Sequence, residues 1–144
     1  MKKIDYKQLI ISIAIPLLLG GVVGFLIKDA TKNYNGFIPG YIFPVVWTIL
    51  YILMGIASYL IRDDKKLLKT YSLNLVINFI WPIIFFLLNL KLLALVDLII
   101  LIFVVIYMIN SFYKKDKLSG YLLMPYLLWL FVAFILNVVE LFKI

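Results

Sequence analysis

Five long apolar stretches occupy almost the whole of this 144-residue chain, at about 9–27, 42–61, 67–89, 92–110 and 120–142. A helix needs about 20 apolar residues to cross the hydrocarbon core of a bilayer, and each stretch is close to that length. Strands of a membrane barrel would be shorter and would alternate apolar with polar residues, which none of these stretches does. The sequence therefore predicts an all-α integral membrane protein, a five-helix bundle in which residues 1–144 form one domain.

Composition supports a membrane protein and excludes several kinds of site. Hydrophobic residues make up 66% of the chain, more apolar surface than a soluble core of this size can bury. Cysteine and histidine are both absent, which removes the thiol nucleophile, the commonest general base and the usual metal and haem ligands. We therefore expect no catalytic site, no metal site and no required cofactor.

Charge between the apolar stretches predicts the orientation. Ten Lys and Arg residues lie at the amino terminus and in the second and fourth loops, against four on the opposite side. This bias places the amino terminus in the cytoplasm of a bacterial-type cell and the carboxyl terminus outside. The net charge of +7 suggests membrane lipid headgroups as partners, because no basic run is long enough for nucleic acid.

Two features near the amino terminus leave alternatives open. Lys2 and Lys3 before an apolar run imitate a signal peptide, but the run is long and 27–29 does not resemble a cleavage site, so we interpret it as a spanning helix. The first loop, residues 28–40, carries Tyr34, Phe37 and Pro39. It is either an ordinary solvated connection or a lid over a binding site.

Three tryptophans, Trp47, Trp81 and Trp129, lie inside three different apolar stretches. Tryptophan normally gathers at the membrane interfaces, and a deeper indole N–H needs a partner inside the protein. These rings are therefore expected to face a shared interior. Helical spacing places each of them on a stripe with polar or aromatic side chains: Trp47, Tyr51, Met54 and Ser58; Asn74, Asn78, Trp81 and Phe85; Tyr126, Trp129, Ala133, Asn137 and Glu140.

The polar residues on these stripes have two interpretations. Asn74, Asn78 and Asn137 either join helices by hydrogen bonds or supply amide groups to a cavity with aromatic walls, which would suit a large planar ligand. Asp97, about two turns into the fourth stretch, is a further candidate because a carboxylate at that depth is costly. It is protonated, paired with a neighbouring asparagine or tyrosine, or directed to the interface.

Four segments resemble the TspO/MBR family of tryptophan-rich sensory and translocator proteins. They are FPVVWTILYILMGIASYL at 43–60, NLVINFIWPIIFF at 74–86, ALVD at 94–97 and LLMPYLLW at 122–129, the last continuing to Ala133 and Asn137. The segments occur in the family's order and the resemblance extends over about residues 9–142. The first loop departs from the family pattern, because 33–36 reads NYNG and only Pro39 remains of a proline pair.

The resemblance implies a bundle that often forms homodimers and binds porphyrins such as protoporphyrin IX, or sterols and other polycyclic hydrophobic molecules. Taken with the stripes, it gives these ligand-binding candidates: Trp47, Tyr51, Asn74, Asn78, Trp81, Asp97, Tyr126, Trp129 and Ala133. Three functions remain: a porphyrin receptor or sensor, light- and oxygen-dependent porphyrin degradation with tryptophan as the reactive partner, and transport of a tetrapyrrole or lipid. The absence of an inverted repeat gives the third little support.

Overall fold

A computed structural model describes residues 3–32 and 41–143 of the chain. Its elements are α1 (Tyr6–Lys32), α2 (Ile42–Leu60), α3 (Lys65–Pro82), η1 (Ile83–Leu87), α4 (Lys91–Lys115), α5 (Lys117–Leu122) and α6 (Met124–Leu141). Within the described residues, five helical segments are long and apolar enough to cross a membrane, with α3 and η1 forming one and α5 and α6 another. The predicted all-α membrane bundle is confirmed.

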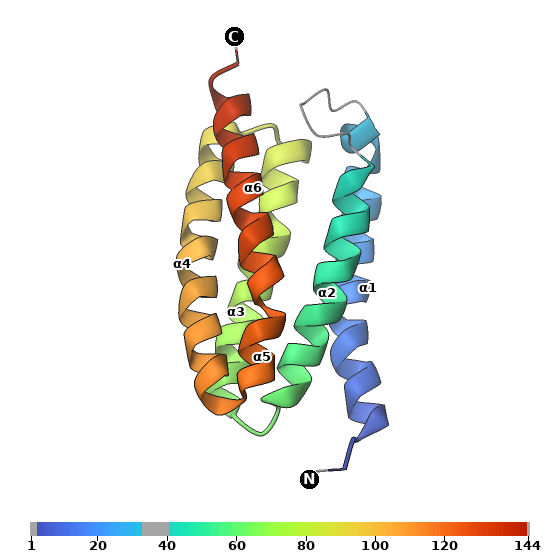
Figure 1. Cartoon of the computed structure of the whole chain (residues 1–144). Helices are drawn as coiled ribbons and strands as arrows, with labels where there is room; N and C mark the ends of the chain where they lie inside the picture. Colours follow the sequence, from blue (N-terminus) through green and yellow to red (C-terminus); the bar gives the residue numbers. More distant parts are fainter. Residues whose placement is uncertain (1–2, 33–40, 144) are drawn as a thin grey trace.

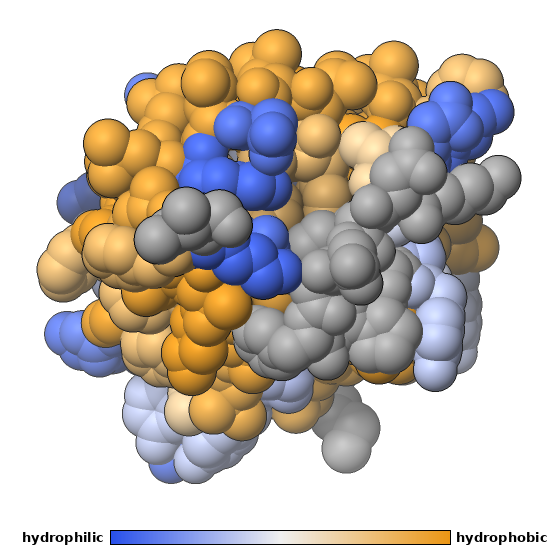
Figure 2. Space-filling model, turned by 90° about the horizontal axis from the view of Figure 1, so that it is seen from above, coloured by the Kyte–Doolittle hydropathy of each residue, from blue (hydrophilic) through white to orange (hydrophobic). Residues whose placement is uncertain are grey.

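The helices run up and down, so that the amino and carboxyl termini lie at opposite ends of the bundle (Figure 1). Helix α1 packs mainly against α2, and α4 packs against both α3 and α6. The interior contains large, fully buried side chains such as Trp81, Phe85, Phe112 and Tyr126. Viewed from the end that carries the carboxyl terminus, hydrophobic residues cover the upper edge and much of the left edge of the bundle (Figure 2). This outer surface is suited to contact with lipid.

Helix α1 is longer than the sequence predicted. It continues to Lys32, so Lys28 and Thr31 are helical residues and not part of the first loop. The Thr31 hydroxyl donates to the Lys28 carbonyl oxygen at 2.9 Å. The apolar pattern ends at Ile27, but the backbone continues as a helix because no helix-breaking residue follows within that turn.

We expected the third span to be a regular α-helix to its end, but the structure shows that it is not. After Pro82 the chain forms a π-helical turn, η1, with the Leu88 N–H donating to the Ile83 carbonyl oxygen at 2.9 Å. Proline cannot donate a backbone hydrogen bond, so the ladder is interrupted where its N–H would lie. The span then ends at Asn89, whose φ of 55° is left-handed. The wider turn changes the direction of the side chains that follow Pro82.

The fifth span is also divided. It begins at Lys117, three residues earlier than predicted, with Asp116 as the N-cap that accepts from the N–H groups of Leu118 and Ser119. The helix breaks at Leu123, just before Pro125 in the first turn of α6. A proline is tolerated in a first helical turn but not in a helix interior, which explains the position of the break.

Candidate ligand-binding site

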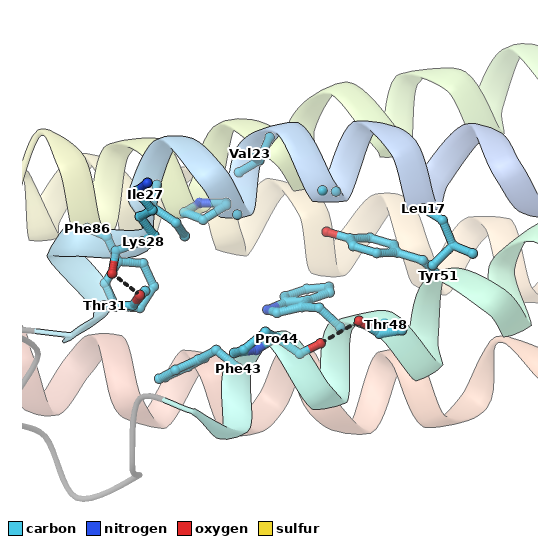
Figure 3. A pocket seen from close by; sticks show the side chains of 15 residues that line it. Leu17, Val23, Ile27, Lys28, Thr31, Phe43, Pro44, Thr48, Tyr51 and Phe86 are labelled. Carbon is cyan, nitrogen blue, oxygen red and sulfur yellow. Dashed lines mark hydrogen bonds between the residues drawn. The ribbon is translucent and has the colours of Figure 1, made fainter.

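A cavity of about 360 Å³ lies between α1, α2 and the end of the third span. We call it the α1–α2 groove (Figure 3). It is lined from α1 by Leu17, Gly20, Gly21, Val23, Gly24, Ile27, Lys28 and Thr31, from α2 by Phe43, Pro44, Trp47, Thr48 and Tyr51, and by Pro82 and Phe86. The volume is in the range of small-molecule sites, and the lining is mostly apolar.

The α2 side of the groove is an aromatic wall. Trp47 and Tyr51 stack with ring centroids 5.5 Å apart and an angle of 23° between their planes. The Trp47 and Trp129 rings are nearly perpendicular, with centroids 6.3 Å apart. The centroid of the Phe43 ring lies 5.9 Å from that of Trp129 and 5.3 Å from that of Phe86. These rings form a continuous cluster beside the cavity, of the kind that can stack on a planar ligand.

Three glycines, Gly20, Gly21 and Gly24, line the α1 side of the groove among larger side chains. A Cβ atom at Gly20 would collide with the Tyr51 ring, so this glycine allows the ring to lie against α1. A Cβ at Gly21 or at Gly24 would meet no atom within 4 Å, because both residues face open space. The absence of side chains therefore creates part of the groove.

Beneath the aromatic wall, a chain of hydrogen bonds joins α2, α3 and α6. The Tyr51 hydroxyl donates to Asn78 Oδ1 at 3.1 Å, and Asn78 Nδ2 donates to Tyr126 Oη at 2.7 Å. The Tyr126 hydroxyl donates to Asn74 Oδ1 at 2.6 Å, and Asn74 Nδ2 donates to the Tyr71 carbonyl oxygen at 3.2 Å. Among the described residues these amides bond to protein partners, and neither asparagine lines the groove.

The three tryptophans have different surroundings. Trp47 is half-buried and lines the groove, whereas Trp81 is completely buried and its indole N–H donates to Asn137 Oδ1 at 2.9 Å. Trp129 lines a shallower apolar depression between α2 and α6, and its buried Nε1 has no hydrogen-bond partner among the described residues. The rings share one aromatic cluster, because Trp81 contacts Phe86 at 6.1 Å, but only Trp47 reaches the cavity.

The remaining predicted residues lie away from the groove. Ala133 and Tyr126 are fully buried on α6. Asp97 on α4 is only partly buried, and its Oδ2 is enclosed with no hydrogen-bond partner in the described part of the chain. Their role as ligand contacts stays a prediction. The lid residues Tyr34, Phe37 and Pro39 lie outside the described residues.

Sequence reasoning missed the contribution of α1. Gly20 and Gly24 were visible as a pair of small residues that would let another element approach closely, and such a pair is common by chance in apolar sequence. Lys28 and Thr31 were assigned to a loop, although they belong to α1 and line the groove. Pro82, the last residue of α3, and Phe86, in the π-helical turn that follows it, also line the groove.

The sequence model of the TspO/MBR family matches residues 12–141 of the chain, which includes the first span from residue 12 onward, the other four spans and every residue of the groove. The chain has no match among curated proteins.

Proposed function

Because the chain belongs to the TspO/MBR family, whose members are membrane sensors and binding proteins, we propose that it binds a porphyrin of the protoporphyrin IX type in the α1–α2 groove. The observation that carries the proposal is the Trp47 ring, stacked on Tyr51, with open space at Gly21 and Gly24 on the α1 side of the groove. A flat macrocycle needs two such surfaces, one that stacks and one that does not intrude.

The polarity of the groove fits the same ligand. Its lining is apolar along most of its length, and it includes Lys28 near the end of α1, whose ammonium lies 4.2 Å from the centre of the Phe25 ring. Protoporphyrin IX is an apolar macrocycle with two carboxylates on one edge. The ring would occupy the aromatic part of the groove while a carboxylate pairs with Lys28.

The proposal can be tested by filling the groove. A Cβ at Gly24 would meet no atom within 4 Å, so we expect Gly24→Phe to place its ring in the ligand's volume and to leave the bundle folded. Leu18→Phe is the matched control, because Leu18 is exposed on the same helix and does not line the groove. Protoporphyrin IX is titrated into purified wild type and both variants while tryptophan fluorescence is followed.

We expect Gly24→Phe to lower the affinity at least about tenfold and Leu18→Phe to leave it unchanged. Equal affinity in all three proteins would contradict the assignment of the groove. The same samples distinguish the other functions of the family. A changed visible spectrum of the recovered porphyrin after illumination would indicate degradation, and movement of porphyrin into sealed vesicles would indicate transport.

A further inference from the structure

A second cavity, of about 530 Å³, lies at the opposite end of the bundle from Lys28, where α1 begins, α2 ends and α3 begins. We call it the amino-end pocket. Its rim carries the charged residues Asp5, Arg62 and Asp63, and its lining includes the hydroxyl groups of Ser12, Ser58 and Tyr71. It shares no residue with the α1–α2 groove, so it is a separate site on the molecule.

Interactions between helices hold the rim in place. The Asp5 backbone N–H donates to the Tyr59 hydroxyl at 2.7 Å, which ties the start of α1 to the end of α2. Arg62 Nη1 donates to the Tyr59 carbonyl oxygen at 2.9 Å, and the Arg62 guanidinium lies 3.9 Å from the centre of the Tyr59 ring. A guanidinium has five N–H donors, so an Arg62 held in this way retains donors for a ligand.

The floor of the pocket contains polar groups that are shielded from solvent. Tyr71 is 6% exposed, and its hydroxyl oxygen has no hydrogen-bond partner among the described residues. Ser58 lies beside it, but the Ser58 hydroxyl donates to the Gly55 carbonyl oxygen. Ser12 is 7% exposed on the facing helix. A buried hydroxyl without a partner is costly, so these groups are suited to receive a polar ligand.

The arrangement of charge selects the ligand. One guanidinium can bind a phosphate, while the Asp5 carboxylate, whose Oδ1 accepts from the Gln8 N–H, attracts a cation. The pocket carries groups of both signs, so a headgroup that is only anionic would leave the Asp5 carboxylate without a cation. A phosphate joined to a primary ammonium satisfies both signs.

The apolar part of the lining indicates that this headgroup belongs to a lipid. Ile15, Leu68 and Leu75 complete the pocket, and Ile15 is 47% exposed on the outer side of α1. Acyl chains could therefore leave the pocket along an apolar surface into the bilayer. We propose that the amino-end pocket binds the headgroup of an ethanolamine phospholipid, with its phosphate on Arg62 and its ammonium on Asp5.

The test compares lipids that differ only in the headgroup. Native mass spectrometry of the delipidated full chain would measure binding of phosphatidylethanolamine, phosphatidylcholine and phosphatidylglycerol with identical acyl chains. We expect phosphatidylethanolamine to bind at least about fivefold more tightly than either of the others. Phosphatidylcholine has no N–H to donate to Asp5, and phosphatidylglycerol has no cation.

Variants assign the contacts. Arg62→Gln should weaken phosphatidylethanolamine binding about tenfold and Tyr71→Phe about fivefold. Asp5→Asn should remove the preference over phosphatidylcholine and still cap α1, because asparagine is as good an N-cap as aspartate. The matched controls, which should bind as wild type does, are Lys69→Gln and Tyr107→Phe, neither of which lines the pocket.

Two results would overturn the proposal. The first is equal affinity of the wild type for the three lipids, or equal binding of phosphatidylethanolamine by Tyr71→Phe and Tyr107→Phe. It would show that the pocket does not distinguish lipid headgroups. Binding of water-soluble O-phosphoethanolamine as strongly as the lipid would identify the ligand as a free phosphate ester. Neither result depends on porphyrin binding, so the two proposals can fail independently.

Discussion

The indole N–H of Trp81 donates to Asn137 Oδ1 at 2.9 Å inside the bundle, near the ends of α3 and α6, where neither residue is more than 1% exposed. Asn137 in turn donates from Nδ2 to the Lys91 carbonyl oxygen at 2.8 Å. A single amide therefore connects α3, α4 and α6. The indole N–H of Trp81 therefore has a hydrogen-bond acceptor within the protein, as a polar group inside a membrane requires.

Breaking this hydrogen bond should destabilise the bundle. Asn137→Leu leaves the Trp81 N–H unpaired, and Trp81→Phe leaves the Asn137 oxygen unpaired. Each variant should lower the free energy of unfolding by about 1–3 kcal/mol, the cost of a buried polar group without a partner. Thermal or denaturant unfolding in one detergent measures the change.

The double variant provides the control. If the two residues act through one hydrogen bond, Trp81→Phe combined with Asn137→Leu should cost less than the two single losses added together. Strict additivity would show that the contact contributes nothing to stability.

The two half-buried tryptophans should differ in their effect on ligand affinity. Trp47→Leu removes the stacking surface of the α1–α2 groove, so we expect protoporphyrin IX affinity to fall about tenfold. Trp129→Leu changes a ring of the same cluster that lies outside the cavity and should leave affinity unchanged. A titration that gives equal losses would place the ligand between the two rings and not in the groove.

Lys28 should recognise the carboxylates of the ligand. Lys28→Gln is expected to weaken protoporphyrin IX binding about threefold at low salt, and less as salt rises, because Lys28 is solvent-exposed and its ion pair is screened. The dimethyl ester of the same porphyrin has no carboxylate and should bind wild type and variant equally. A similar loss of affinity with the ester would show that Lys28 contributes through packing against the ligand and not through its charge.

Two glycines on facing helices should respond in opposite ways to alanine. A Cβ at Gly55 would lie 2.8 Å from the Ser12 carbonyl oxygen, so Gly55→Ala should force α1 away from α2. We expect a loss of about 1–3 kcal/mol in the free energy of unfolding, more than the gain in helix propensity.

Gly21→Ala adds the same methyl group where no atom lies within 4 Å. It should leave stability unchanged or raise it slightly, because alanine is the better helix former. Unfolding midpoints of both variants in the same detergent check the pair, and equal shifts would contradict the close approach at Gly55.

Parts of the site could be predicted because they depend on spacing along one helix. Asn74, Asn78 and Trp81 are buried as expected, since residues at this spacing share one face of α3. Phe85 of the same predicted stripe is also buried, although it lies in the π-helical turn, where this spacing does not apply. The partners of these residues could not be predicted in the same way. That Asn78 bonds Tyr51 and Tyr126 while Trp81 bonds Asn137 depends on the rotation and depth of three separate helices.

The sequence by itself determined that five segments are helical and which faces are polar. The reason is local: in lipid each backbone must satisfy its own hydrogen bonds, so apolar runs of this length become helices. Only the tertiary structure decided that the groove opens against α1, that Trp47 alone of the three tryptophans reaches it, and that a second pocket forms at the amino end. These outcomes depend on how closely neighbouring helices approach at Gly20 and Gly55 and on the altered turn after Pro82, which involve residues far apart in the chain.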